Sequence, residues 1–377
     1  MPAYTTSDIR NIALVGHQSA GKTSLAEAML HASGMTNRLG DVTNGTSHLD
    51  FMDEEKTRKC SIDSALAYVK VKGKIINIVD TPGAPDFIGP AIAALAGVET
   101  AVCVISATAG IEVNTRRMME RAKEFGLGRM IVINKIDQNL DLAGLVAGIQ
   151  ELFGHECQCM NLPSRDGKSV IDCFKNKEGD AAFGSVEETH TALIERIVEE
   201  DEALMETYLE TGDIDPEKLA KLISKEVMHG TFVPIFFTNA RGETGVKEMM
   251  EYLADYAPCP EEGRDHYLIH GDKKEAIKPD PNAKFVGQVF KVFTDPKSNI
   301  KYSICRIHAG TIRSDTQIYI GEDRKPQRPG TIYKLIGAEH PDIDEGIPGD
   351  IIALAKLDTR IGQVLHADSE GATMEMP

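Results

Sequence analysis

The residues best suited to chemistry lie near the amino terminus, in the run Gly16 to Thr23 (G-H-Q-S-A-G-K-T). Glycines let the backbone curl so that successive N–H groups point at phosphate oxygens, and a helix N-terminus favours the same negative charge. Lys22 would reach the outer phosphates, and the hydroxyl of Thr23 would ligate Mg²⁺. The spacing therefore predicts a P-loop, with phosphate contacts from Gly16, His17, Gln18, Ser19, Ala20, Gly21, Lys22, Thr23 and Ser24.

A second motif, Asp80-Thr81-Pro82-Gly83, directly follows an apolar run. Asp80 would support Mg²⁺ through a bound water, as carboxylates commonly do for this ion. The N–H of Gly83 would sense the γ-phosphate of a bound nucleoside triphosphate. The motif is weak alone, but downstream of a P-loop it strengthens the prediction of a nucleoside triphosphate site.

A third motif, Asn134-Lys135-Ile136-Asp137, predicts which base is bound. The carboxylate of Asp137 can accept from both the N1–H and the exocyclic amine of guanine, an arrangement that adenine lacks. Lys135 would pack along the base and Asn134 would brace the P-loop. A fourth, less specific contact to the guanine carbonyl is expected from the backbone of Asn239 and Ala240. The predicted cofactors are GTP or GDP with Mg²⁺.

The elements that must position these motifs alternate between apolar strands and helices. We expect strands at 10–15, 74–79, 100–105, 129–133 and 231–237, with helices beginning near Gly21 and covering 113–125, 141–153 and 243–256. This alternation is typical of a parallel sheet covered by helices on both faces, with ligands at the carboxyl ends of the strands. Each motif falls at such an end, so the predicted fold is an α/β P-loop G domain.

The rest of the chain departs from this pattern. Residues from about 155 to 230 read as an α+β insertion, with one amphipathic helix over 186–209. Residues 257–282 resemble a linker, and from Lys284 short alternating strands at 284–293, 301–309, 317–320, 331–336 and 350–355 predict an antiparallel β-barrel. We therefore expect a G domain at 1–280, carrying the insertion, and an antiparallel β-barrel at 281–377.

Composition restricts the class of protein. With 42% hydrophobic and 26% charged residues, the chain is typical of a soluble globular protein rather than a disordered one. The net charge is −17, but residues 178–217 carry 14 acidic and one basic side chain, so contact with RNA elsewhere is not excluded. Seven scattered cysteines, an odd number, argue against a disulfide framework, and no apolar run or leader predicts a membrane or export. A cytoplasmic protein that does not contact membranes is expected.

With these motifs in place, the sequence resembles the elongation factor G family of translational GTPases. The resemblance includes the switch-like segments Asp50 to Glu55 and Arg58 to Ile62, the insertion, and the barrel-opening run Gln288 to Lys297. It implies that Ser61 stands where the family's threonine closes over Mg²⁺. It also implies a monomer whose partner, in the full-length protein, is the ribosome through ribosomal RNA and a stalk protein. Because the family has further carboxy-terminal domains, we expect this chain to be an amino-terminal fragment.

Departures from the family pattern concern hydrolysis. The family's D-T-P-G-H reads D-T-P-G-A here, so Ala84 replaces the histidine that orients the attacking water. Gln18 and Ser19 replace the usual isoleucine and aspartate. A positioned acid–base group is worth about 10²–10⁴ in rate, so stimulated hydrolysis is expected to fall while nucleotide binding survives. Gln18 is either a substitute water-orienting group or simply part of the pocket wall.

Two classes of function fit these residues. The first is a ribosome-associated GTPase switch with weakened hydrolysis, in which GTP orders the segment around Ser61. The second is a non-hydrolysing GTP-binding module, which Ala84 favours. A ribosomal protection or release-type translational GTPase is a further alternative of the first kind. The acidic 178–217 stretch fits a docking face for the stalk protein and a solvated surface equally well.

Overall fold

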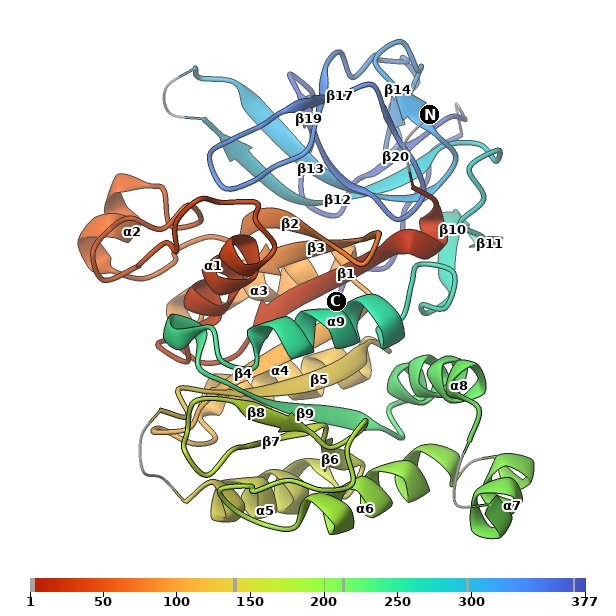
Figure 1. The fold of residues 1–377 in the computed structure, drawn as a ribbon. Helices are drawn as coiled ribbons and strands as arrows, with labels where there is room; N and C mark the ends of the chain where they lie inside the picture. Colours follow the sequence, from red (N-terminus) through yellow and green to blue (C-terminus); the bar gives the residue numbers. More distant parts are fainter. Residues whose placement is uncertain (1–3, 138–140, 200, 212–213, 296–297, 369) are drawn as a thin grey trace.

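A computed structural model of the chain contains a seven-stranded sheet in the order β2-β3-β1-β4-β5-β9-β6 (Figure 1). The structure describes residues 4–137, 141–199, 201–211, 214–295, 298–368 and 370–377. The strands are β1 (Ile9–Val15), β2 (Ala65–Val71), β3 (Lys74–Asp80), β4 (Thr100–Ser106), β5 (Gly128–Asn134), β6 (Cys157–Cys159) and β9 (Val233–Thr238). Every pair is parallel except β2–β3, which is an antiparallel hairpin.

Two hydrophobic layers lie on opposite faces of this sheet because successive side chains of a strand point to opposite sides. In β1, Ile12 and Leu14 join one layer, whereas Ala13 and Val15 join the other. The first layer is covered by α1 (Lys22–Ala32), α6 (Val186–Val198), α8 (Pro216–His229) and α9 (Val246–Tyr256). The second is covered by α3 (Ile88–Ala94), α4 (Val113–Glu124) and α5 (Leu142–Phe153). The predicted α/β fold class is confirmed.

The segment predicted as an insertion is tied to the sheet more closely than expected. Its strand β6 pairs with β9 at the sheet edge, and β7 (Asn161–Pro163) and β8 (Val170–Asp172) form a separate hairpin. The prediction of one helix over 186–209 is wrong, because α6 ends at Val198 and α7 (Glu202–Thr211) begins afresh. The Asp201 carboxylate accepts from the Leu204 N–H at 3.0 Å and caps the new helix. None of the described helices has the length and apolarity to cross a bilayer.

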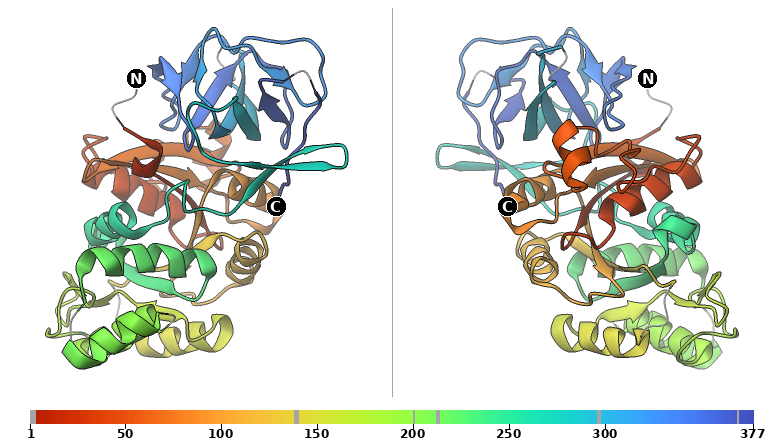
Figure 2. Two further views of the ribbon diagram at one scale, coloured as in Figure 1. Left: turned by 90° about the vertical axis from the view of Figure 1, so that its right-hand side faces the viewer. Right: turned by 90° about the vertical axis from the view of Figure 1, so that its left-hand side faces the viewer.

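The stretch predicted as a linker contains an antiparallel hairpin. Its strands are β10 (His266–His270) and β11 (Lys273–Ile277), joined through Gly271 and Asp272. Figure 2 shows the hairpin projecting from the side of the molecule, between the large sheet and the carboxy-terminal strands. Its charged outer strand concealed it in the sequence, because β11 (K-K-E-A-I) lacks the alternation that predicts a half-buried strand.

The carboxy-terminal part is an antiparallel, rolled sheet in the order β15-β20-β12-β13-β19-β16-β17, as the fold class predicted (Figure 1). Its core is formed by inward-facing aliphatic side chains such as Val289, Ile307 and Leu354. The strands are β12 (Val286–Thr294), β13 (Lys301–Ala309), β15 (Tyr319–Ile320), β16 (Ile332–Tyr333), β17 (Asp342–Ile343), β19 (Ile351–Ala355) and β20 (Val364–His366), with a small pair β14 (Ile312–Arg313) and β18 (Glu345–Gly346) beside them. The sequence did not predict β17, β20 or the small pair.

A bulge in β12 joins the barrel to the large sheet. Val289 pairs with Cys305 and Lys291 with the next residue, Ile304, so Phe290 has no partner across the ladder. The extra residue breaks the alternation: Val289 and Val292 face the barrel core, while Phe290 packs into the layer beneath α3 and α4. Phe290 is therefore a hydrophobic contact between the two parts of the chain.

Replacing Phe290 by alanine should lower the free energy of unfolding by about 3–5 kcal/mol, because a buried ring is lost from a packed layer. Urea denaturation followed by circular dichroism measures this loss. The matched control is Val289→Ala in the same strand, which removes a side chain from the barrel core alone. We expect the two-part structure to lose cooperativity only in Phe290→Ala. A loss below about 1 kcal/mol would contradict the packing described here.

Candidate nucleotide-binding site

The turn between β1 and α1 forms the phosphate loop. Gly21 precedes α1 in the left-handed region, at φ 97°, and a Cβ there would lie 2.3 Å from Asn134 Nδ2. Only glycine fits this combination of backbone angle and close approach. Lys22 Nζ donates to the carbonyl oxygens of Gly16 and His17, at 3.1 and 2.8 Å. The ammonium group thus lies over the loop, where it can exchange these contacts for phosphate oxygens.

The three predicted Mg²⁺ residues converge at the start of α1. Thr23 Oγ1 donates to Asp80 Oδ2 at 2.7 Å and lies 3.1 Å from Ser61 Oγ. Ser61 Oγ in turn donates to Asp50 Oδ1 at 2.8 Å. Asp50, which had been noted in the sequence only as part of the switch-like segment, is therefore a fourth member of this cluster. The donor set is made of oxygen atoms, the ligands that Mg²⁺ prefers.

The electrostatics of the cluster also suit a cation. Burial raises the pKa of Asp80, with a contribution from nearby Asp50, and burial lowers the pKa of Lys22. Within the described part of the chain, neither Asp80 Oδ1 nor Asp50 Oδ2 has a hydrogen-bond partner. Buried carboxylate oxygens without partners are costly. These two atoms, beside the hydroxyls of Thr23 and Ser61, fit a bound Mg²⁺ and its waters.

Two buried glutamates hold the segment that carries Ser61. Glu27, on α1 and fully buried, accepts from the backbone N–H groups of His48 and Leu49 and from the Ser47 hydroxyl, at 2.6 to 3.1 Å. Glu55, on α2 (Asp53–Arg58), accepts from the N–H groups of Met52 and Ile62, at 3.2 and 3.1 Å. The approach of Ser61 to Thr23 is thus fixed from both sides of its loop.

The barrel contacts the same segment. Lys291, brought to the outer face of β12 by the bulge, forms an ion pair with Asp63 at 2.6 Å and donates to the carbonyl of Ser64. Asp63 and Ser64 lie just beyond Ser61. Burial lowers the pKa of Lys291, and the Asp63 carboxylate opposes that shift. The position of the barrel is therefore linked mechanically to the Ser61 loop.

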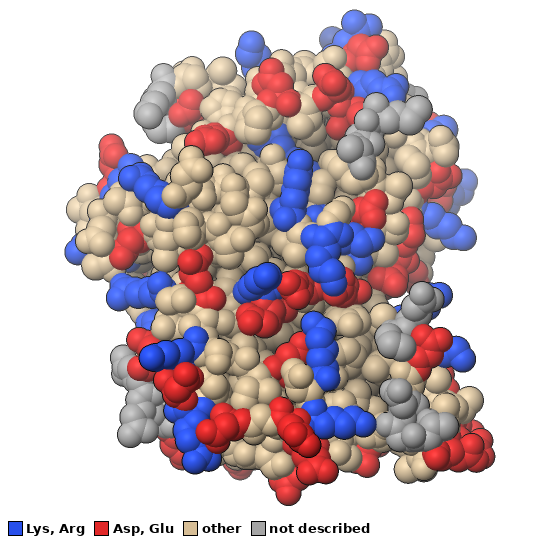
Figure 3. All heavy atoms as spheres, in the orientation of Figure 1, with Lys and Arg blue, Asp and Glu red and all other residues tan. Residues whose placement is uncertain are grey.

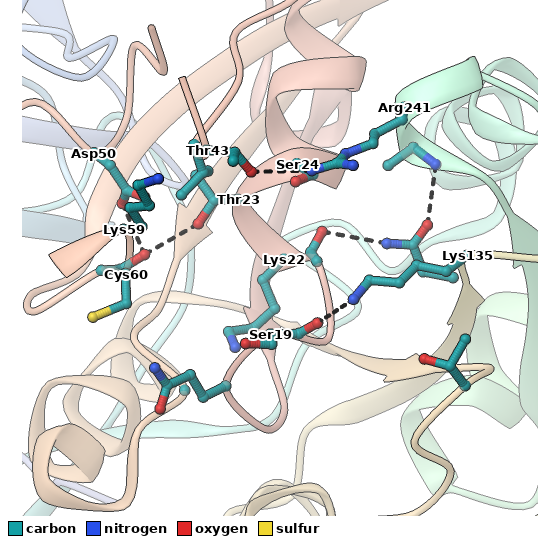
Figure 4. Close-up of a pocket in the computed structure, with 18 of the residues that line it drawn as sticks. Ser19, Lys22, Thr23, Ser24, Thr43, Asp50, Lys59, Cys60, Lys135 and Arg241 are labelled. Carbon is teal, nitrogen blue, oxygen red and sulfur yellow. Dashed lines mark hydrogen bonds between the residues drawn. The ribbon is translucent and has the colours of Figure 1, made fainter. Parts of the chain in front are cut away.

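At the other end of the site, Asn134 links three loops. Its Nδ2 donates to the carbonyl oxygen of Ala20 at 3.2 Å, and its Oδ1 accepts from the N–H of Ala240 at 3.0 Å. The Thr238 hydroxyl also reaches Oδ1, at 3.3 Å. Lys135 extends beside it and donates to the carbonyl of Ser19 at 2.6 Å (Figure 4). The bracing of the P-loop by Asn134 is as the sequence predicts.

The base-reading groups lie at the mouth of the same site. Asp137 is exposed, and no described residue hydrogen-bonds to its carboxylate, so both oxygens are available to a base. The Ala240 N–H, predicted to contact the guanine carbonyl, is shared with Asn134 Oδ1 in this structure. Arg241, missed in the sequence, donates to Thr43 Oγ1 at 3.1 Å and closes this side of the pocket (Figure 4).

A cavity of about 400 Å³ joins the phosphate and base ends. The predicted residues that line it are Gln18, Ser19, Gly21, Lys22, Thr23, Ser24, Ser61, Gly83, Asn134, Lys135, Asp137, Asn239 and Ala240. Residues that line it without having been predicted are Val42, Thr43, Asp50, Lys59, Cys60, Thr108 and Arg241. As far as the chain is described, Gly16, His17, Ala20, Asp80 and Ala84 are not among the residues that line it. No sequence signal marks Thr43 or Arg241, since Thr43 lies in a turn and Arg241 in the short 3-10 helix Ala240–Gly242.

The two positions tied to hydrolysis differ in their setting. Gln18 is exposed on the cavity wall, and Ala84 is half-buried at the start of the short helical turn Pro85–Phe87. A Cβ on neighbouring Gly83 would lie 2.2 Å from Lys22 Nζ, so that backbone runs directly beside the phosphate loop. The backbone beside the phosphate loop therefore leads directly into Ala84, whose side chain carries no polar atom.

Gly21→Ala should weaken the binding of GDP and GTP alike by at least about tenfold, because the new methyl group would displace Asn134 and strain the loop. Fluorescent nucleotide titration measures both affinities. The matched control is Gly34→Ala, which has a comparable φ of 75° with no heavy atom within 4 Å of the added Cβ among the described residues. Equal affinities in the two variants would show that Asn134 does not constrain the loop.

Comparison with known proteins agrees with this geometry. The family model of the elongation factor Tu GTP binding domain matches residues 7–259, and that of elongation factor G domain 2 matches residues 284–368. Elongation factor G of Mycoplasma genitalium is 29% identical over 98% of this chain and 56% of its own length. A crystal structure of a protein from Thermus thermophilus superposes with a TM-score of 0.82 at 28% identity, covering 98% of this chain and 55% of that one.

The chain thus spans just over half the length of each of these relatives. The two family matches follow one another along the chain in the same order as the large sheet and the barrel. The GTP-binding match contains the phosphate loop, the Asp80 motif and the Asn134 motif. The chain belongs to the elongation factor G family of translational GTPases.

Proposed function

We propose that this chain binds GTP and GDP with Mg²⁺ and forms the nucleotide-dependent switch of a ribosome-associated GTPase. The observation that carries the proposal is the convergence of Thr23, Ser61 and Asp80 at one end of the cavity. Asn134 and Asp137 lie at its other end, at a spacing set by the sheet. Membership of the elongation factor G family supports the same assignment.

Each part of the site has a role in this proposal. Lys22 and the P-loop N–H groups would hold the phosphates, and Asp137 would accept from guanine. Mg²⁺, when bound, would offset the charge of the phosphate oxygens. Ser61 would release Thr23 after the γ-phosphate departs, and its loop would then relax. Lys291 pairs with Asp63 and donates to the Ser64 carbonyl in the same loop. The position of the barrel would therefore change with the nucleotide state.

Hydrolysis would be slow by the family's usual route, because Ala84 offers no atom to orient water. The side chain of Gln18 lines the cavity and could supply an amide in its place. The second candidate function is a GTP-binding module that does not hydrolyse, and Ala84 is the observation that favours it. The two differ only in turnover, since every binding group is common to both.

The proposed partner of the full-length protein is the ribosome, through ribosomal RNA and a stalk protein. Figure 3 shows acidic side chains at the lower end of the molecule, where α6 and α7 lie. We assign this end the contact with the stalk protein. We also propose a working division into a G domain at 1–280, whose inserted part covers about 155–230, and a barrel at 281–377. Lys291 and Phe290 would transmit nucleotide-dependent movement across that boundary.

The proposal is tested by measuring multiple-turnover GTP hydrolysis, with and without ribosomes. The unmodified full-length protein and its Ala84→His variant are assayed in parallel. We expect ribosome-stimulated turnover in the unmodified protein and an increase of about 10²–10⁴ when histidine is introduced. Ala84→Leu is the matched control, because it adds bulk without a polar atom and should not raise the rate.

The outcomes separate the two functions. Stimulated turnover in the unmodified protein excludes the non-hydrolysing module. Turnover that begins only with Ala84→His excludes the GTPase and leaves the binding module. No GTP binding in any variant would remove both.

A further inference from the structure

A second cavity, of about 510 Å³, lies where the loop after α9, the β10–β11 hairpin and strand β13 meet. It is separate from the nucleotide site, with which it shares no lining residue. Its volume is that of a site for a small molecule. The side chains that give it a distinct chemistry are two histidines and two arginines, His266, His308, Arg264 and Arg306.

The two histidines face one another with unused polar atoms. Their ring centroids lie 4.2 Å apart, and His308, on β13, is only 4% exposed. Among the residues that the structure describes, His266 Nδ1 and His308 Nε2 are buried and have no hydrogen-bond partner. Burial, with nearby Arg264 and Arg306, lowers the pKa of His266 to about 3 and also lowers that of His308. Both rings are therefore neutral at physiological pH, and each can donate one N–H.

The two arginines are unequally compensated. Arg306 is 2% exposed and paired with Glu99, whose second oxygen accepts from Asn11 at 2.7 Å. Both Glu99 oxygens already accept hydrogen bonds from other residues, so Glu99 compensates Arg264 only through a longer-range attraction. The Arg264 guanidinium stacks on the Phe125 ring at 3.6 Å from the centroid. Its one carboxylate contact within the described chain is Glu375, at 3.9 Å. A largely buried guanidinium with so little compensation is unfavourable unless another anion approaches it.

We propose that this cavity binds a small oxyanion, a phosphate group, held by Arg264 and by the N–H groups of His266 and His308. Arginine suits the planar approach of phosphate oxygens, and the neutral imidazoles supply additional donors. A metal cation is disfavoured, because two guanidinium groups line the same cavity. The ligand supplies Arg264 with a closer anionic partner than the Glu375 carboxylate, which lies 3.9 Å away.

The rim of the cavity restricts the size of the ligand. Three of its residues, Glu261, Asp265 and Asp280, are exposed carboxylates, and one, Lys278, is an exposed cation. An extended polyanion such as single-stranded RNA would pass these carboxylates and be repelled. A single phosphate group carries far less charge and has no further phosphates to place against these carboxylates. The chemistry therefore fits inorganic phosphate or a small phosphate monoester rather than a nucleic-acid backbone.

Nitrogen-15 spectra of the histidine rings in the full chain test this site directly. His266→Gln and His308→Gln assign the two signals. Inorganic phosphate and glycerol 3-phosphate are then titrated separately. We expect saturable shifts of both signals, and at least about tenfold weaker binding in Arg264→Gln. Tighter binding of glycerol 3-phosphate identifies a monoester as the ligand, and equal binding identifies the free anion; both support the site.

Three controls keep the result specific. Arg360→Gln removes an exposed barrel arginine outside the cavity and should bind phosphate as the unmodified chain does. Arg264→Lys keeps the charge and packing but removes the planar fork, so it should weaken binding less than Arg264→Gln. Lys22→Ala disables the nucleotide phosphate loop and should leave the His266 and His308 shifts intact. The site is overturned if neither probe shifts these signals, if Arg264→Gln has no effect, or if only an RNA oligonucleotide moves them.

Discussion

One buried amide holds the nucleotide site together. Asn134, 1% exposed at the end of β5, bonds to the phosphate loop through Nδ2 and to the loop after β9 through Oδ1. Strands β5 and β9 are neighbours in the sheet, so this contact fixes the base-reading loops relative to Gly21. Buried amides of this kind must be fully bonded to be tolerated. The geometry of Asp137 relative to the phosphates therefore depends on sheet register more than on loop sequence.

A second level of organisation joins this site to the barrel. Because of the bulge in β12, the Phe290 side chain packs into the hydrophobic layer under the large sheet. The neighbouring Lys291 points to the Ser61 loop and pairs with Asp63. One extra residue thus provides both the attachment and the electrostatic link. Glu27 and Glu55 hold the same loop from the other side. Several independent contacts thus hold the loop. A nucleotide-dependent switch needs such contacts, because only then can release of the loop move a neighbouring domain.

The sequence was informative where a local pattern has a direct physical cause. Apolar runs predicted the bounds of the central strands to within one or two residues. Motif spacing correctly brought Thr23 and Asp80 together at the carboxyl ends of the strands. It was less informative where tertiary contacts decide the structure. The β10–β11 hairpin has a charged outer strand, and the break before α7 depends on the cap at Asp201. Arg241 entered the site only because its loop faces Thr43, a contact that no spacing rule contains.

The central claim is that the cavity holds a guanine nucleotide, and base preference in Asp137→Asn tests it most directly. The change is nearly isosteric and exposed, so the fold should persist. Affinities for GTP and xanthosine triphosphate are measured by calorimetry in both proteins. The account predicts that GTP binding falls by at least about tenfold while xanthosine triphosphate binding rises, since an amide donates where xanthine carries a second carbonyl. An unchanged preference for GTP would contradict it.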